Sequence, residues 1–473
     1  MDRMLLAAMD AVEQAALVAS GAASPAELVA AALERAAAVE PQIHAIAALD
    51  AEGAKQRAMA VSGPLAGVPF LVKDVLPYPG LPCRFGSRLF AQPVFGPHSP
   101  YSERLAAAGL LAIGTSTSSE FGLLGSTETL LYGATHNPWD LRRSAAGSSG
   151  GAAAAVAAGI VPLAHASDAG GSIRLPAAVC GVFGFKPSRG RCVPGGPAGS
   201  RFAALVVDHC ISRSVRDSAR LLSLTEAHGA EAAFQPIGYV QQPLDRPLRI
   251  GVWCSTVHGE APDPEVAGAL SGTIALCRQL GHSVVAAASP ALNAAALSDA
   301  FFSVAGAAMS ELVGTVETAM GQPVAPDQLE PFTRSLIAWY RDGGGVPSDG
   351  ADAAFAEAAA CYHSALEPFD VLLTPTTPSV AWPLGTLAPT LDRETLFRRT
   401  ERIAGYTAIH NIGGCPAMSV PLWWSAAGLP IGSQFAARPG DDALLLRLAY
   451  QLETAAPWCD RWAPHSFPRL AGR

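Results

Sequence analysis

The chain has 473 residues, half of them hydrophobic, and it carries a formal net charge of -8 at pH 7. This length and apolar content allow a large buried core, whereas the acidic balance and the lack of a basic cluster argue against nucleic acid and anionic membranes as partners. Nine cysteines without a CxxC pair, and no histidine–cysteine spacing typical of a metal site, predict a reduced cytoplasmic protein that uses neither a metal nor another cofactor.

Neither the amino-terminal segment nor the longest apolar stretch predicts a membrane segment. Asp10 and Glu13 interrupt the first residues before the apolar core of a signal peptide could form. The longest apolar stretch, Ala152 to Ala164, is too short to span a bilayer and contains Pro162. We therefore expect no contact with a membrane.

The first 60 residues predict two helices that precede the core. Ser24, Pro25 and Glu27 mark the start of the second helix, because they supply an N-cap, a proline at the first helical position and a capping-box glutamate. An apolar run from Gly67 to Val72 then predicts a buried strand that ends at Lys73. Burial disfavours the charged form of a lysine, so Lys73 is expected to be either paired or chemically active.

Two serine-bearing loops follow, and an alanine-rich segment separates them. Ser148 and Ser149 lie between glycines, where a loop is expected to lead into a helix. Ser172 ends the segment 168–172, whose two glycines allow consecutive backbone N–H groups to converge as an oxyanion hole requires. Because a serine nucleophile needs a base, these loops predict Ser172 as the nucleophile and Lys73, held neutral by burial, as its base.

The second half of the chain predicts alternating strands and helices. Residues 228–247 are rich in proline, glycine and glutamine, which is typical of a surface connection. A strand at Leu248 to Trp253, a helix from Asp263 to about Gly281 and a strand at Ser283 to Ala286 follow, and Val371 to Thr374 predicts a further buried strand. This alternation indicates an α/β layer architecture.

An ordered set of motifs resembles the amidase signature family of serine hydrolases. The motifs are Gly67 to Asp74, Glu120 to Gly122, Asn137 to Asp140, Gly147 to Gly151, Asp168 to Arg174, Cys180-Gly181, Lys186-Pro187, Ser214 to Asp217, Pro375 to Pro378 and Gly428 to Gly432. The resemblance covers almost the whole chain and implies an α/β fold, a large mixed β-sheet covered by helices on both faces.

The same resemblance implies one domain over residues 1–473. Residues 1–60 would form the N-terminal helices and 61–227 the catalytic signature core. Residues 228–247 would be the surface connection, and 248–473 a second lobe that completes the sheet and the substrate pocket.

The resemblance also implies roles for individual residues. In a Ser-cisSer-Lys triad, Ser172 would be the nucleophile, Ser148 the bridging serine after an unusual cis peptide, and Lys73 the base. The backbone N–H groups of Ala169, Gly170, Gly171 and Ser172 would form the oxyanion hole.

Three further residues are expected to support this site. Asp168 and Arg174 flank the nucleophile and predict an ion pair that fixes its loop. Ser149 is expected to form a hydrogen bond within its own loop. We expect all three to act structurally.

Within the family, residues 167–172, 411–421 and 457–461 resemble the 6-aminohexanoate-oligomer hydrolases and related amidases that act on unnatural amides or carbamates. The implied reaction is hydrolysis of non-peptide C–N bonds in a small-molecule amide, with urethanes, anilides and esters as further substrate classes. Residues 299–346 and 411–424 are expected to contribute pocket walls. Dimers are common among soluble enzymes, so a homodimer is one expected assembly state.

Two other functions stay open at this point. The pattern Gly147-x-Ser149-x-Gly151 satisfies the nucleophile elbow of α/β-hydrolase esterases, with Ser149 as nucleophile and His209, His410 or His465 as base. Against it, residues 141–146 do not have the pattern of the strand that should precede an elbow.

The second alternative is a partner-dependent glutaminase, the amidase-like subunit of an amidotransferase complex. In such subunits a proline and a glycine usually precede the double-serine loop, whereas Ala145 and Ala146 stand there in this chain. Residues 209–211 likewise stand where a Gly-Pro segment is common. These departures favour a stand-alone hydrolase.

Overall fold

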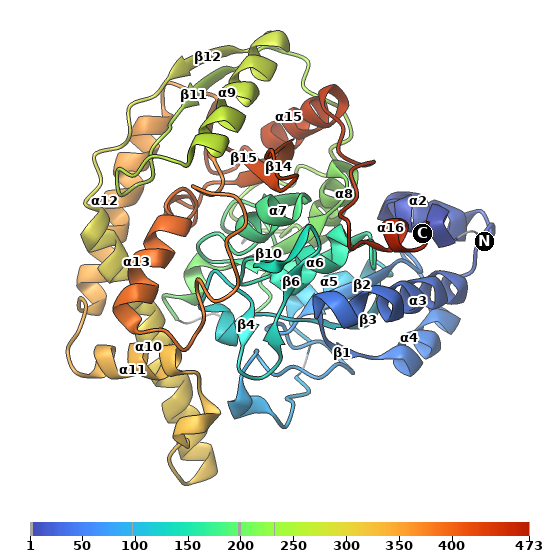
Figure 1. Cartoon of the computed structure of the whole chain (residues 1–473), viewed down its shortest axis with the longest axis horizontal. Coiled ribbons are helices and arrows are strands. Elements are labelled where there is room, and N and C mark those ends of the chain that lie inside the picture. Colours follow the sequence, from blue (N-terminus) through green and yellow to red (C-terminus); the bar gives the residue numbers. More distant parts are fainter. Residues whose placement is uncertain (1–2, 97, 197–199, 231, 473) are drawn as a thin grey trace.

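The computed structural model describes residues 3–96, 98–196, 200–230 and 232–472. An eleven-stranded mixed sheet lies at its centre, and helices surround this sheet (Figure 1). In spatial order the strands are β1 (Ile46–Leu49), β3 (Leu111–Ser116), β2 (Pro69–Lys73), β8 (Leu163–Asp168), β10 (Val207–Ser212), β9 (Phe183–Lys186), β14 (Ala417–Trp424), β15 (Pro430–Ala436), β13 (Val371–Pro375), β11 (Arg249–Val252) and β12 (Ser283–Ala286). Two small hairpin sheets pair β4 (Glu128–Thr129) with β5 (Gly133–Ala134) and β6 (His136–Asn137) with β7 (Asp140–Ser144).

The α-helices fall into groups along the chain. They are α1 (Arg3–Ala8), α2 (Ala11–Ala19), α3 (Pro25–Ile43), α4 (Ala51–Arg57), α5 (Pro100–Ala107), α6 (Gly150–Ala157), α7 (Arg174–Cys180), α8 (Val215–Thr225), α9 (Pro264–Gln279), α10 (Ala294–Met320), α11 (Pro331–Arg341), α12 (Ser348–Leu366), α13 (Arg393–Ile403), α14 (Ala408–Ile412), α15 (Asp442–Ala455) and α16 (Phe467–Leu470). Short 3₁₀ helices lie at Ala58–Ala60, Arg88–Phe90, Glu120–Gly122, Ala203–Leu205 and Pro326–Gln328.

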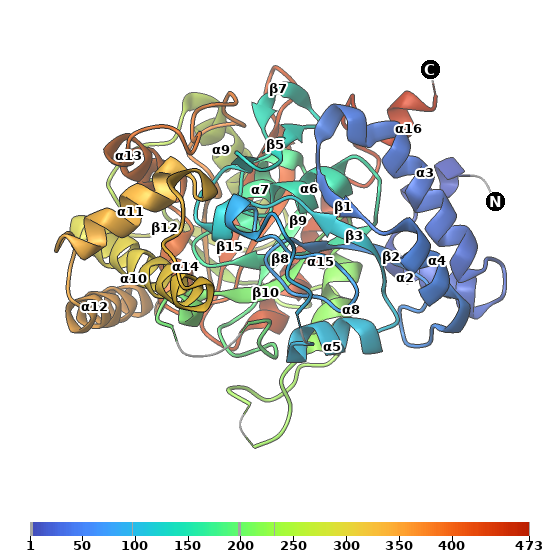
Figure 2. The same ribbon diagram turned by 90° about the horizontal axis from the view of Figure 1, so that it is seen from below.

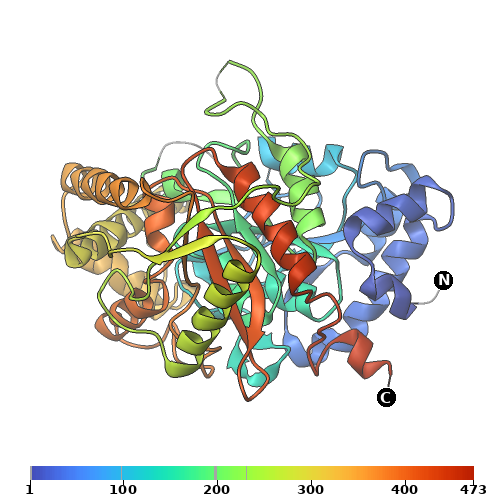
Figure 3. The same ribbon diagram turned by 90° about the horizontal axis from the view of Figure 1, so that it is seen from above.

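Helices cover both faces of the sheet, and neighbouring residues of β15 show this directly. A Cβ placed on Gly432 would lie 2.6 Å from Ala178 Cβ of α7. The next residue, Ser433, instead places its hydroxyl 2.7 Å from that of Thr273 on α9. Because successive strand residues point to opposite faces, α7 and α9 lie on opposite sides of the sheet. Figure 3 looks onto the face that carries α9, in yellow-green, and α15, in red. The predicted α/β fold is confirmed.

The alanine-rich helix α6 lies in the core of the α7 face. All eight of its residues are buried, and its alanines belong to the largest hydrophobic cluster. A Cβ on Gly151 would lie 2.5 Å from the backbone nitrogen of Thr117 and 2.6 Å from Ala45 O, so only glycine allows this close approach. The alanine tract is therefore a packing device that lets α6 approach the sheet closely.

Several predicted elements are confirmed. The capping box of Ser24 and Glu27 opens α3. In the second lobe, β11, α9, β12 and β13 all lie where the sequence predicts them. These elements depend on local patterns that the sequence shows directly.

Two predictions are wrong. The first 60 residues contain four α-helices and strand β1 rather than two helices, because short helices with their own caps at Asp10 and Asp50 interrupt the segment. Residues 140–144 form β7, whereas we expected no strand over 141–146. This strand is stabilised by pairing with β6, a contact that its own composition does not indicate.

The connection at residues 228–247 contains no α-helix or sheet strand in its described part. In Figure 2 its light-green first part extends away from the sheet beyond α8. Val240 and Leu244 are buried in the same cluster as Leu248, so the second part packs against the core. The sheet continues on both sides of this connection, which supports the prediction of one domain.

Helix α10 is long and apolar enough to cross a membrane by length and composition, with a mean hydropathy of 1.3 over its most apolar window. Half of that window is buried inside the protein. Phe302 and Ala305 join the largest core cluster, and Val304 joins the cluster that includes residues of α12. These contacts are those of a core helix.

The close contact between β15 and α7 gives a stability prediction. We expect Gly432→Ala to lower the free energy of unfolding by about 1–3 kcal/mol, because the new Cβ would overlap Ala178. Gly268→Ala on α9 is the matched control, since nothing lies within 4 Å of its added Cβ. The control should raise stability by up to about 1 kcal/mol. Urea denaturation of both variants measures this, and a Gly432→Ala protein as stable as the wild type would contradict the packing described.

Candidate active site

Lys73 is the last residue of β2 and is only 1% exposed. Its Nζ lies 2.6 Å from Ser148 Oγ and 3.0 Å from Ser167 Oγ. Burial lowers the pKa of Lys73 from 10.5 to about 7, although the negative charges of Asp208 and Asp168 oppose this shift. A large fraction of this amine is therefore neutral near pH 7, as a general base must be.

A polar pair lies behind Lys73. The backbone N–H of Lys73 donates to His165 Nδ1 at 3.3 Å, so His165 is the tautomer that carries its proton on Nε2. That Nε2 donates to Asp208 Oδ1 at 3.1 Å. The pair places a carboxylate close enough to influence the charge on Lys73.

Ser148 lies in the loop that opens α6, and the Gly147–Ser148 peptide is cis, as the resemblance implied. A Cβ on Gly147 would lie 2.5 Å from Ser126 O, so this loop tolerates no side chain there. On the other side, a Cβ on Gly122 would lie 3.4 Å from Ser148 Oγ. Ser148 therefore lies between the buried amine and Gly122, which lines a cavity.

Ser149 differs from its prediction. Its Oγ donates to Ser167 O on β8 at 3.2 Å, rather than to a group within its own loop. The bond joins the start of α6 to the strand that leads to Ser172. The contact is structural, but it links two elements instead of closing one loop.

The nucleophile elbow at Ser149 is not formed. Ser149 is fully buried, although β7 does precede it. The three candidate histidines bond elsewhere: His209 to Ser218, His410 to Tyr362 and His465 to Gln42. The geometry offers Ser149 neither a base nor access to a substrate.

Ser172 follows β8 and is half-buried at the wall of a cavity. Ala169 and Gly170 line the same cavity, so the nucleophile candidate and two oxyanion candidates face one space. In the part of the chain that the structure describes, no hydrogen bond joins Ser172 to Ser148. Catalytic hydrogen bonds commonly tighten only when substrate is bound, so this geometry is compatible with a relay.

Gly171 departs from the prediction for the oxyanion hole. Its N–H donates to Asp168 Oδ1 at 2.7 Å, which engages the group in holding the loop. Over the described ranges, the N–H groups of Ala169, Gly170 and Ser172 have no protein acceptor. These three remain the candidate donors to an oxyanion.

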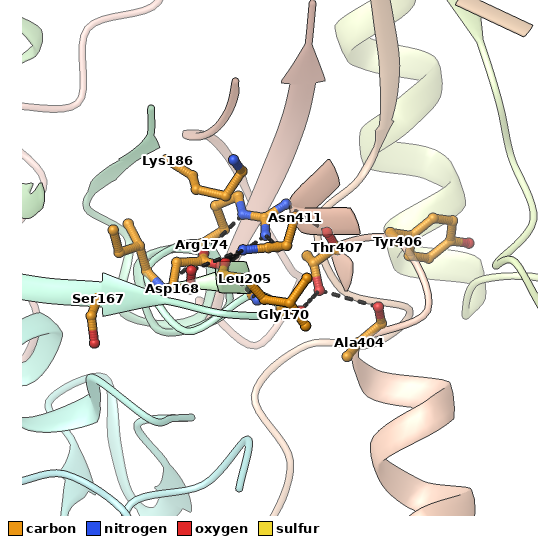
Figure 4. A network of polar contacts seen from close by, with 12 residues as sticks. Ser167, Asp168, Gly170, Arg174, Lys186, Leu205, Ala404, Tyr406, Thr407 and Asn411 are labelled. Carbon is orange, nitrogen blue, oxygen red and sulfur yellow. Dashed lines mark hydrogen bonds and ion pairs between the residues drawn. The ribbon is translucent and has the colours of Figure 1, made fainter. Parts of the chain in front are cut away.

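The predicted ion pair between Asp168 and Arg174 is confirmed, with both side chains fully buried and 2.9 Å apart. Burial alone would raise the pKa of Asp168, but the Arg174 guanidinium holds it well below its usual range. Arg174 also donates to Thr407 O and to the side chains of Asn411 and Gln434. Figure 4 shows this network beside Gly170. The pair thus connects the nucleophile loop to α14 and β15.

Asn411 and Ser167 are site residues that the sequence analysis did not assign. Asn411 Nδ2 donates to Asp168 O at 2.8 Å, so this residue supports the loop rather than lining the cavity as expected. Ser167 contacts Lys73, and its position directly before Asp168 was the available signal. Thr407 adds a hydrogen bond from its hydroxyl to Gly170 O.

The predicted pocket walls are confirmed in part. From the segment 299–346, Phe301 and Phe302 line the cavity, whereas Met309 packs in a separate cluster and Met320 is partly exposed. From 411–424, Ile412 contributes to the lining. The remaining lining is mainly apolar, which favours an apolar group next to the reacting bond.

Comparison with known proteins agrees with this geometry. Residues 27–446 match the family described as Amidase. The chain is 35% identical to a 6-aminohexanoate-cyclic-dimer hydrolase of Pseudomonas sp. over 96% of both chains. It is 33% identical to an acylamidase of Rhodococcus erythropolis, again over 96% of both.

A solved structure of 6-aminohexanoate cyclic dimer hydrolase complexed with substrate has a similar fold, with a TM-score of 0.89 and 32% identity. The match covers 97% of this chain and 99% of that one. The sequence motifs, the fold and these relatives agree, and the chain belongs to the amidase family.

Proposed function

We propose that this protein hydrolyses the C–N bond of small-molecule amides through a covalent intermediate on Ser172. The observation that carries the proposal is the 2.6 Å approach of Lys73 Nζ to Ser148 Oγ in a buried site next to the cavity that Ser172 lines. Family membership supports the reaction class. Neither the elbow geometry nor a second polypeptide is needed to assemble these groups.

In the first half of the reaction, neutral Lys73 takes the proton of Ser148, and Ser148 takes the proton of Ser172. Ser172 Oγ then forms a bond to the substrate carbonyl carbon. The negative charge that develops on the carbonyl oxygen is stabilised by the N–H groups of Ala169, Gly170 and Ser172.

In the second half, the C–N bond breaks and the departing nitrogen receives its proton through Ser148 from the Lys73 ammonium. This leaves an ester on Ser172 and restores the neutral amine. Water repeats the same steps on the ester, which releases the acid and the free serine. Each proton that Lys73 accepts is returned, so no other reactant is required.

The apolar cavity supports an amide with a hydrocarbon group beside the carbonyl. The names of two relatives, a cyclic-dimer hydrolase and an acylamidase, support the same class. All nine cysteines carry free thiols. We accordingly place the reaction in the cytoplasm, where thiols stay reduced.

Covalent labelling tests the nucleophile. A fluorophosphonate should label Ser172, and mass spectrometry of the modified peptide identifies the site. Lys73→Ala should slow both labelling and anilide turnover by roughly 10³-fold or more, because the serine loses its base. Ser149→Ala is the matched control and should still be labelled at Ser172. Labelling of Ser149 in the wild type would overturn the assignment.

The pKa of Lys73 gives a pH prediction. Because the neutral amine is the active form, kcat/KM should fall as the pH drops below about 7. Asp208→Asn should move this fall to lower pH, since the Asp208 charge favours the ammonium form of Lys73. The substitution keeps an acceptor for His165, and the exposed Asp352→Asn on α12 is the control that should leave the profile unchanged. A profile with no fall between pH 5 and 8 would exclude Lys73 as the base with this pKa.

A further inference from the structure

The cavity beside Ser172 has a polar end that the proposed reaction does not use. Ser298, Thr400 and Glu401 line it together with the apolar side chains already described. Ser298 lies on α10, and the other two lie on α13. Charged and hydroxyl groups on the wall of an otherwise apolar cavity commonly fix the orientation of a ligand.

The position of this polar end follows from the geometry of α10. Its cavity-lining residues include Leu297, Ser298, Phe301 and Phe302, which lie on one face of the helix. A Cβ on Gly170 would lie 3.2 Å from Phe301 Cζ, so the Phe301 end adjoins the oxyanion loop. Ser298 is three residues earlier and therefore lies about one helical turn, ~4.5 Å, further along the axis.

The opposite wall is arranged in the same order. A Cβ on Gly170 would lie 3.8 Å from Ala408 Cβ, at the start of α14. Ala404 precedes it by four residues, and Glu401 and Thr400 lie one turn earlier still on α13. The stacked rings of Phe302 and Phe397, 3.6 Å apart, join the two walls. Both walls thus run from apolar residues at the oxyanion loop to polar residues further away.

The groups at the polar end have unused hydrogen-bonding capacity. Glu401 Oε1 accepts a hydrogen bond from Ser298 Oγ. In the described structure Glu401 forms no ion pair, and its neighbour Arg402 binds Glu260 and Asp263 instead. The Thr400 hydroxyl is buried and has no hydrogen-bond partner among the described residues. A buried hydroxyl left without a partner is costly, so a ligand that satisfies it gains affinity.

We infer that Glu401, Ser298 and Thr400 form a subsite for a primary ammonium group, which an apolar chain joins to the scissile amide carbonyl. An ammonium offers three donors, and the carboxylate and two hydroxyl oxygens supply three acceptors. The carboxylate also neutralises the charge in a cavity of otherwise apolar walls. The inference rests on the proposed function and narrows its substrate class to amides of ω-amino acids.

Binding to the unreactive Ser172→Ala protein tests the subsite without turnover. Calorimetry would compare 6-aminohexanamide with heptanamide, in which a methyl group replaces the ammonium, and with the monoamide of heptanedioic acid, in which a carboxylate does. We expect the ammonium ligand to bind at least tenfold more tightly than the other two. Glu401→Gln in the same background should remove this preference, and the control Glu394→Gln, at an exposed position of α13, should keep it.

The outcomes separate the two proposals. Equal binding of the three amides, no binding of any, or a preference that survives Glu401→Gln would overturn the ammonium subsite. Tighter binding of the carboxylate ligand would also overturn it and would assign this end of the cavity to His258, which lines it too. Failure of the hydrolase proposal is read independently, from the absence of fluorophosphonate labelling at Ser172 in the wild-type protein.

Discussion

The buried ion pair between Asp168 and Arg174 is the interaction on which the arrangement of the site depends. Removing two charges from water is costly, and a buried pair persists only where further hydrogen bonds satisfy it. Here Asp168 accepts the N–H groups of Gly171 and Ile173, and Arg174 donates to groups on α14 and β15. The loop that carries Ser172 is therefore held from both lobes of the chain, and its free N–H groups face the cavity.

Burial acts in opposite ways on the two charged groups closest to the chemistry. Asp168 keeps its charge because a guanidinium lies against it, whereas Lys73 has only hydroxyl and carbonyl partners and tends to lose its proton. A carboxylate held ionised gives the loop rigidity. An amine that is neutral near pH 7 gives the site a base, so one environment supplies both a scaffold and a reactive group.

The sequence predicted what local patterns and ordered motifs encode: the cap of α3, the succession of β11, α9 and β12, the ion pair, and the approach of Lys73 to Ser148. It did not predict contacts between distant segments. Asn411 supports Asp168 from 243 positions away, and no local pattern indicates such a contact. The partner of Ser149 and the engagement of the Gly171 N–H likewise depend on how β8 and α6 pack, which the motifs alone do not show.

The walls formed by α10 and α13 share no residue with the reacting groups on β2, β8 and the loop before α6. Substitutions on those two helices change what the cavity accepts without touching the proton relay. Selection for a new amide, in nature or in a directed-evolution experiment, can therefore proceed on one set of residues while turnover chemistry stays under the control of another. This separation makes the chain a suitable starting point for diversifying substrate range.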